Sequence, residues 1–140
     1  MATVGETFTS EVMLTPAKVS AFADSVGDTN PVHHDPAFAA STRYKRPIAS
    51  GTHTSALLLA LTASHFSKTG AAVGLDFSCS FRRPVYADET ITLEWTVVGV
   101  TPYQKLEGDI VELEGRIKGQ DGQTALTAKG KALVSTGPSE

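Results

Sequence analysis

The sequence of 140 residues contains only one cysteine, Cys79. An intramolecular disulfide is therefore impossible, and metal sites built from several thiolates are excluded. Cys79 falls on the apolar side of a predicted strand, where a buried cysteine usually packs as a small hydrophobic side chain. We expect a structural role for it.

A strong excess of charge is also missing, as are long apolar runs. Lys and Arg number 12 against 15 Asp and Glu, which gives a net charge of −3, and no basic stripe is present. Nucleic acid is therefore not expected as a partner. The N-terminus lacks the basic and apolar regions of a signal peptide, and no apolar run approaches the roughly 18 residues of a membrane helix. We expect no membrane association and a cytoplasmic location.

Several signatures of catalysis or cofactor binding are absent. The sequence has no G-x-S-x-G elbow, no phosphate-binding loop and no dinucleotide fingerprint. The run His33-His34-Asp35 is too contiguous for its side chains to surround an ion, so no metal site is expected. We expect His34 to alternate away from His33 and to be solvated. His65 is expected to be a helix-end or core histidine.

The first half of the chain carries helical patterns after a short predicted strand at residues 6–14. Thr15-Pro16 is a helix-start signal, and Gly27 can end that helix in the left-handed conformation. Asp35-Pro36 opens a further short helical turn. An apolar run without Gly or Pro predicts a helix over residues 52–66 that is buried nearly all round. In the helix after Thr15, apolar spacing predicts one buried face formed by Val19, Phe22, Ala23 and Val26.

The second half changes to a period of two, which is typical of strands with one buried face. Consecutive strands of this kind predict an antiparallel sheet, and the apolar helix is its natural cover. The chain length fits one α+β domain over residues 1–140, with residues 135–140 as a frayed tail. The alternating positions are Val73, Leu75, Phe77, Cys79 and Phe81, then Ile91, Leu93, Trp95 and Val97, then Val111, Leu113, Gly115 and Ile117, with a fourth strand over 124–134.

The most informative segment is Asp28-Thr29-Asn30-Pro31-Val32-His33, which sets a carboxylate and an imidazole on either side of an Asn-Pro turn. Pro31 fixes its own φ and keeps Asn30 out of the helical region. The loop is therefore expected to hold Asp28 and His33 in one relative orientation. The structural alternative is an Asx-turn, in which Asp28 only caps the backbone and His33 is an ordinary loop residue.

The residues from Phe22 to the Ala39-Ala40 pair resemble the signature of the MaoC-like, (R)-specific enoyl-CoA hydratases. A Pro-Ile-Ala-x-Gly element follows at residues 47–51, and residues 77–84 and 87–89 continue the likeness. The resemblance implies a hotdog fold, in which a curved antiparallel sheet wraps around a long central helix. It implies reversible hydration of a trans-2-enoyl thioester to the (R)-3-hydroxyacyl thioester, without a cofactor.

The resemblance also implies roles for individual residues. Asp28 and His33 would hold one water above C3 of the substrate, with Asp28 as base and His33 passing a proton to C2, or with these roles exchanged. The Gly51 N–H would stabilise the thioester oxygen at the start of the central helix. Many members carry His before this glycine, where the present chain has Ser50. Substrate contacts are expected from Asn30, Ser50, Thr52, His53 and Ser55, and Ser55 could instead pack on its helix.

Two other functions remain open at this point: a hotdog thioesterase, and a non-catalytic subunit that binds acyl chains or a partner protein. The resemblance further implies a homodimer formed by edge-to-edge pairing of the sheets. The substrate carrier is coenzyme A or acyl carrier protein. Basic side chains that would suit the phosphates of the carrier are Arg43, Lys45, Arg46, Arg82 and Arg83.

Overall fold

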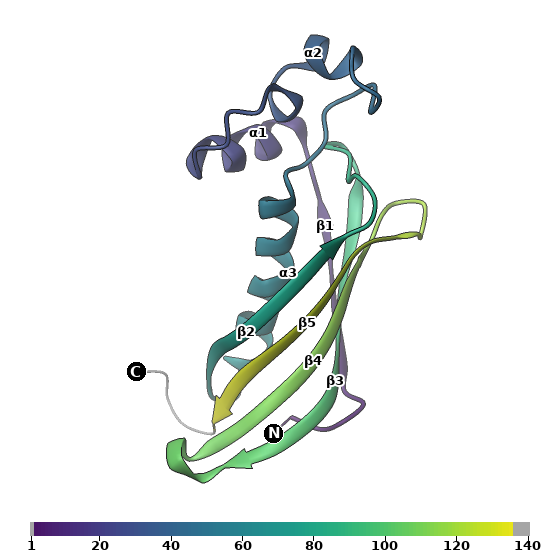
Figure 1. Cartoon of the computed structure of the whole chain (residues 1–140). Helices are drawn as coiled ribbons and strands as arrows, with labels where there is room; N and C mark the ends of the chain where they lie inside the picture. The colour runs from purple at the N-terminus through teal and green to yellow at the C-terminus, as the bar shows by residue number, and fades with distance from the viewer. Residues whose placement is uncertain (1, 136–140) are drawn as a thin grey trace.

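A computed structural model describes residues 2–135. It has a single five-stranded antiparallel sheet with the strand order β1-β3-β4-β5-β2. Figure 1 shows a long helix, α3, running along one face of the sheet, with two shorter helices gathered at the end where α3 begins. The elements are β1 (Thr7–Met13), α1 (Pro16–Ser25), the 3₁₀ helix η1 (Pro31–His33), α2 (Pro36–Ala40), α3 (Gly51–Phe66), β2 (Ala71–Phe81), β3 (Thr90–Tyr103), the 3₁₀ helix η2 (Gln104–Leu106), β4 (Gly108–Lys118) and β5 (Thr124–Ser135).

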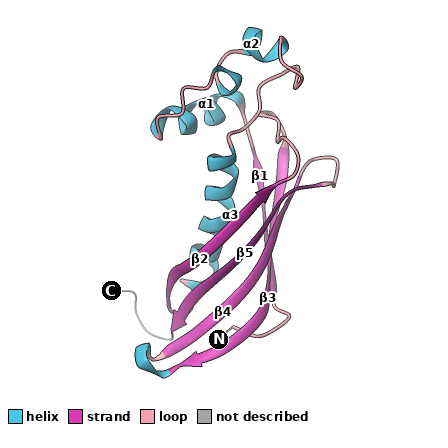
Figure 2. Ribbon diagram, viewed as in Figure 1, coloured by secondary structure: helices cyan, strands magenta, loops and turns pink. Residues whose placement is uncertain are grey.

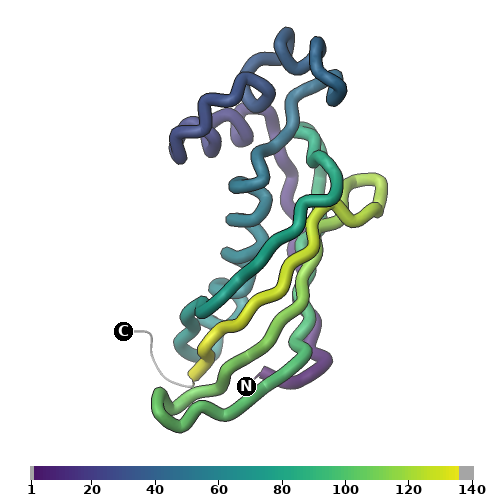
Figure 3. The backbone as a smooth tube through the Cα atoms, viewed as in Figure 1, coloured from purple at the N-terminus to yellow at the C-terminus, as the bar shows by residue number. Residues whose placement is uncertain are grey.

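The architecture confirms the predicted α+β hotdog arrangement. Strands β3, β4 and β5 form a meander, while β1 and β2 occupy the two edges. Figures 2 and 3 show the strands twisting and bending around α3, which is the only long helix of the described chain. Residues 136–140 of the predicted tail lie outside the described residues, and Ser135 is the last residue of β5. No helix within residues 2–135 has the length and apolar character needed to cross a membrane.

The core lies between α3 and the inward face of the sheet, as the period of two predicts for the central strands. Trp95 on β3 is fully buried, and its indole N–H donates to the Leu58 carbonyl of α3 over 2.7 Å. Gly115 lies opposite Trp95 on β4, and a Cβ atom there would come within 2.5 Å of the indole ring. The ring thus occupies the space that the glycine leaves. The predicted inward residues of these strands that are buried are Ile91, Leu93, Trp95, Val97, Val111, Leu113 and Ile117.

The predicted one-sided burial of β2 is wrong. Val73, Leu75 and Phe81 are 59%, 51% and 58% exposed, and only Phe77 and Cys79 pack partly against the core. Two features explain the difference. β2 is an edge strand that pairs only with β5, and a register shift between Gly74 and Asp76 interrupts its alternation.

Cys79 is the partly buried thiol of this strand. Burial raises the pKa of the Cys79 thiol above its usual value.

The prediction that α3 is buried nearly all round is also wrong. One side is buried through residues such as Leu58 and Phe66, while Leu57, Leu59 and Leu61 are only partly covered. The reason is that the sheet covers α3 from one side only. Near the end of α3, His65 contacts the Glu6 carboxylate at 2.6 Å, which ties the helix to the segment before β1.

The start and end signals of α1 are confirmed. The Thr15 side chain accepts from the Lys18 N–H, Pro16 is the first helical residue, and Gly27 has a φ of 80°. Val26 was predicted to lie on the buried face but is 51% exposed, because the helix has already ended at Ser25.

Candidate active site

The chain turns sharply where α1 ends, and this turn places Asp28. The Asp28 N–H donates to the Ala23 carbonyl over 2.8 Å, and the Gly27 N–H donates to the Asp24 carbonyl over 3.1 Å. This pair of bonds is a Schellman motif, which requires the left-handed residue that Gly27 supplies. Asp28 therefore leaves the helix with its backbone already fixed.

The next turn fixes the Asp28 side chain. Asp28 Oδ1 accepts from the Asn30 N–H over 3.0 Å, and Asn30 Oδ1 in turn accepts from the Val32 N–H over 3.2 Å, capping η1. The Asx-turn considered from the sequence is thus present. The turn uses only one of the two carboxylate oxygens, so Oδ2 is still able to accept another hydrogen bond. Asn30, a predicted substrate contact, acts here as the η1 cap and lies exposed.

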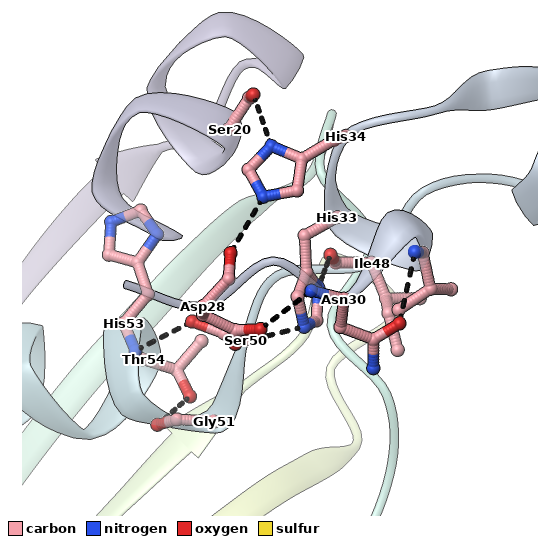
Figure 4. Close-up of polar contacts among 11 residues, drawn as sticks. Ser20, Asp28, Asn30, His33, His34, Ile48, Ser50, Gly51, His53 and Thr54 are labelled. Atoms are coloured by element: carbon pink, nitrogen blue, oxygen red, sulfur yellow. Dashed lines mark hydrogen bonds and ion pairs between the residues drawn. The ribbon is translucent and has the colours of Figure 1, made fainter. Parts of the chain in front are cut away.

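His33 lies opposite the free carboxylate oxygen (Figure 4). Its Nε2 is 3.4 Å from Asp28 Oδ2, and its side chain is 8% exposed against 30% for Asp28. The Nδ1 atom is 2.7 Å from the Ile48 carbonyl. Because a carbonyl can only accept, Nδ1 carries a proton and Nε2 of the neutral ring has a lone pair. Two acceptor atoms therefore face each other, and a water molecule can donate a hydrogen to each.

The prediction that His34 is solvated is wrong. Its Nδ1 lies 2.6 Å from Ser20 Oγ on α1, and its Nε2 lies 2.8 Å from the Asp28 carbonyl oxygen. Figure 4 shows the ring between α1 and the Asp28 turn. No signal in the sequence singled out His34 or Ser20, since the contact joins residues that are separated by the loop.

Gly51 opens α3 next to this pair. The Ile48 carbonyl accepts a hydrogen bond from His33. Ile48 lies three residues before Gly51, so at most about 11 Å of chain separates Ile48 from Gly51. The Ser50 side chain caps α3 by accepting from the His53 N–H over 3.1 Å and is 2% exposed. The Gly51 N–H makes no hydrogen bond with another residue of the described chain, as is usual in a first helical turn. It is therefore available to donate to an acceptor outside the helix.

A cavity of about 520 Å³ adjoins Gly51. Thr54 and Phe81 form part of its wall, and the Phe81 ring lies where a Gly51 side chain would project. Arg43, Arg82 and Arg83 give the cavity a cationic rim. A larger hollow of about 610 Å³ lies on the polar outer face of the sheet, and Arg82 is the only predicted site residue that lines it.

The arginines differ in how firmly they are held. Arg46 lies over the Tyr86 ring at 3.7 Å and near the Asp88 carboxylate at 3.6 Å, so it is already engaged. A hydrogen bond to Tyr44 raises the pKa of the exposed Arg43 above its usual value. Arg82 contacts the Thr127 hydroxyl through its Nε atom over 3.1 Å, which leaves the end of its guanidinium group available.

His53, Ser55 and Thr52, the other predicted substrate contacts, make no hydrogen bond to the side chain of Asp28 or His33 within residues 2–135. His53 is 7% exposed and stacks on Phe22 with ring centroids 4.4 Å apart, and its Nδ1 has no hydrogen-bond partner within residues 2–135. Burial lowers the pKa of His53 below its usual value. The Ser55 hydroxyl donates to the Thr52 carbonyl over 3.1 Å, which is the helix contact considered for it from the sequence. Thr52 is exposed on the first turn of α3.

Comparison with known proteins agrees with this fold. The model of the MaoC-like domain family matches residues 2–114. The chain is 38% identical over 118 residues to the (R)-specific enoyl-CoA hydratase of Aeromonas caviae, covering 84% of this chain and 83% of that protein. It is 29% identical over 120 residues to the 3-hydroxybutyryl-CoA dehydratase of Methylorubrum extorquens, covering 80% and 76%.

Solved structures of hydratases also resemble this chain. The (R)-hydratase from A. caviae involved in PHA biosynthesis superposes with a TM-score of 0.86 at 32% identity, covering 95% of this chain and 97% of that one. R-hydratase PhaJ1 from Pseudomonas aeruginosa has a TM-score of 0.85 at 27% identity, with 99% and 84% covered. The present chain belongs to the MaoC-like family of hotdog proteins.

Among residues 2–135, no three His, Cys, Asp or Glu side chains are grouped to hold a metal ion.

Proposed function

We propose that the protein is a hydro-lyase that adds water to trans-2-enoyl thioesters to give (R)-3-hydroxyacyl thioesters, or catalyses the reverse dehydration. The observation that carries this proposal is the pairing of Asp28 Oδ2 with His33 Nε2 at 3.4 Å. Both atoms accept hydrogen bonds, both belong to one short loop, and a single water can donate to both at once. The (R) stereochemistry is taken from the similarity to the A. caviae hydratase.

The tautomer of His33 favours the exchanged assignment of roles. With the proton on Nδ1 donated to Ile48, the Nε2 lone pair takes a proton from the water as the water oxygen bonds to C3. Asp28 Oδ2 accepts the second hydrogen of the water, which orients the oxygen, and then stabilises the imidazolium. The Nε2 proton passes to C2. One water is consumed, and both side chains return to their starting states.

Charge that develops on the thioester carbonyl oxygen during attack is stabilised at the start of α3. The free Gly51 N–H and the positive helix end supply this stabilisation, and a single donor of this kind typically contributes about 10²–10³ in rate. The acyl group is already activated by the thioester, so no cofactor is required. The cationic rim of Arg43, Arg82 and Arg83 suits the phosphates of coenzyme A or of the acyl carrier protein prosthetic group.

We further propose that the active form is a homodimer assembled through the β2 edge. β2 has one free edge and carries the exposed apolar residues Val73, Leu75 and Phe81. An uncovered apolar edge strand is a natural site for pairing with a second sheet. Helix α3, which carries the partly covered Leu57, Leu59 and Leu61, packs against β2.

The decisive experiment follows the loss of enoyl absorbance with crotonyl-CoA while free thiol is measured in parallel. Asp28→Asn and His33→Ala are each expected to lower kcat by about 10²–10⁴, the usual contribution of a general acid or base. The double variant is expected to be little worse, because the two groups act on one water. Asp24→Asn, which alters an exposed carboxylate on α1, serves as the matched control and should retain activity.

The same assay separates the rival functions. Thiol release without loss of the double bond would identify a thioesterase, which shares the oxyanion donor but has no need of the Asp28–His33 pair. Binding of the thioester without either reaction would identify a non-catalytic subunit. Chiral analysis that gives mainly (S) product would contradict the stereochemical part of the proposal.

A further inference from the structure

Every polar group of Asp28 except Oδ2 is already engaged. The N–H donates to Ala23, Oδ1 accepts from Asn30, and the carbonyl accepts from His34 at 2.8 Å. The first two bonds are local, since their partners lie within five residues along the chain. The bond from His34 is the only one of the three that involves a side chain beyond the turn. It comes from the residue directly after His33.

His34 is itself held in place from the other side. Its ring is only partly exposed, and Ser20 Oγ on α1 lies 2.6 Å from Nδ1. The Asp28 carbonyl can only accept, so Nε2 carries the proton and Nδ1 of the neutral ring accepts from the Ser20 hydroxyl. The two adjacent histidines therefore hold opposite tautomers: Nδ1–H in His33 and Nε2–H in His34. Each tautomer is set by a backbone carbonyl.

We propose that Ser20 and His34 form a positioning relay that holds the Asp28 carboxylate at its working distance from His33. The inference rests on the proposed hydration, because it assigns the relay to the pair that performs it. His34 touches no reacting atom. Through Ser20 it connects helix α1 to the carbonyl group of Asp28. The loop is thus held at the Asp28 end by His34 and at the His33 end by the Ile48 carbonyl.

The contribution of the relay is expected in the chemical step rather than in binding. A displacement of about 1 Å in a catalytic group can cost about 10²-fold in rate, even when the mutated residue does not touch the substrate. Loss of the relay leaves the cavity and the arginine rim unchanged. Its removal is therefore expected to lower kcat with little change in KM.

The test compares three substitutions at His34 and Ser20. His34→Leu keeps most of the side-chain volume but removes both hydrogen bonds, and we expect kcat for crotonyl-CoA to fall by about 10- to 100-fold. His34→Gln supplies an amide donor to the Asp28 carbonyl and should recover most of that loss. Ser20→Ala should give a smaller fall in kcat, and its effect should vanish in the His34→Leu background.

Ser25→Ala is the matched control for Ser20→Ala. Ser25 lies on the same helix, but its hydroxyl donates to the Phe22 carbonyl over 2.8 Å and has no contact with His34. Wild-type kcat is expected in this variant. Circular dichroism and the urea midpoint of each variant show whether the fold is retained, and the recovery by His34→Gln distinguishes positioning from general destabilisation.

A readout that does not depend on turnover is provided by the tautomers. Nitrogen-15 spectra of the histidine side chains, recorded in mildly alkaline buffer, should show Nε2–H for His34 and Nδ1–H for His33. In His34→Leu, a crystal structure should show a wider Asp28 Oδ2 to His33 Nε2 separation. If the wild-type protein does not hydrate enoyl thioesters, the proposed function fails and these two measurements still decide the relay. Wild-type kcat in His34→Leu, an Nδ1–H tautomer of His34, or an unchanged separation would each overturn it.

Discussion

His53 shows how burial sets the protonation state of a single residue. The ring lies between α1 and α3 against Phe22, its Nδ1 has no partner among the described residues, and burial lowers its pKa. The protonated form is therefore disfavoured in the folded protein. In the unfolded chain the same side chain takes up a proton near its ordinary pKa of 6.5.

This difference predicts a pH-dependent contribution to stability. Below the unfolded pKa the unfolded state binds more protons than the folded state, so the free energy of unfolding falls as the pH is lowered. His53→Phe keeps an aromatic ring against Phe22 and removes the titrating group. Urea unfolding between about pH 8 and about pH 5 should show a shallower loss in His53→Phe than in the wild type. A constant difference between the two proteins across this range would contradict the prediction.

Gly51 illustrates a steric constraint rather than a conformational one. A Cβ atom at this position would lie 2.7 Å from Cε1 of Phe81, whose side chain is 58% exposed in the single chain. We expect Gly51→Ala to fold normally but to push Phe81 into the cavity mouth and raise KM. Phe81→Leu in the same chain should restore KM. Gly51→Val should be far more damaging, because its branched side chain reaches the space in front of the N–H. A raised KM that Phe81→Leu fails to restore would contradict this account.

At this scale the sequence identifies the residues that we propose to be catalytic more readily than the residues that position them. Asp28 and His33 stand in one recognisable motif and face each other in the structure, while Gly51 belongs to the following Pro-Ile-Ala-x-Gly element and opens α3. His34 was misplaced because alternation applies to strands, whereas His33 and His34 lie at the end of a 3₁₀ helix with about three residues per turn. The partner Ser20 lies 14 residues away, and only the folded turn after α1 brings it close.

At the scale of elements, the contact of α3 with the sheet depends on glycines that make room for aromatic rings. Gly115 on β4 faces the buried Trp95, and a Cβ atom would come within 2.5 Å of the ring. Neither the ring, which is hydrogen-bonded to α3, nor the β4 backbone has space to move. Gly115→Ala is therefore expected to lower the free energy of unfolding by about 1–3 kcal/mol, as overpacking usually does.

Gly99 on β3 is the matched control for this prediction. Its Cβ would clash only with Oε2 of Glu112, at the end of a flexible side chain that is 49% exposed, and the next nearest atoms, Cβ and Cδ of Glu112, lie at an ordinary contact distance of 3.5 Å. Gly99→Ala should therefore change stability little, and strand propensity favours the alanine. Chemical denaturation of both variants gives the comparison. Equal losses in the two would show that packing against Trp95 is not the cause.

Most elements could be predicted from local patterns, and the errors occur where burial depends on neighbours. The helix start at Thr15-Pro16 and the alternation in β3 and β4 are confirmed because each follows from local backbone and side-chain rules. The exposure of β2 could not be predicted, since a continuous apolar alternation does not reveal that the strand lies at an edge. The register shift after Gly74 also breaks the regular alternation of the strand, so the residues that the sequence pattern places on the inner face are not the ones that are buried.

For the whole molecule, the edge strand β2 determines the expected assembly. Val73→Lys and Leu75→Lys place charges on the exposed apolar edge and are expected to convert the proposed dimer to monomer in sedimentation velocity experiments. Met13 is 66% exposed on β1, at the opposite edge of the sheet, so Met13→Lys is the matched control and should remain dimeric. Dissociation by Met13→Lys alone would place the interface at the other edge.

The strand order also governs how the chain is completed during synthesis. β1 pairs with β3, so Thr7 must wait for Thr96, and β2 must wait for β5. The loop with Asp28 and His33 leaves the ribosome long before the meander that supports α3 exists. The N-terminal strands are made first, but β1 can pair only after β3 has been made, and β2 only after β5. The nascent chain therefore carries the complete proposed catalytic motif before its fold is finished, and under the proposed function we expect activity only after β5 has closed the sheet.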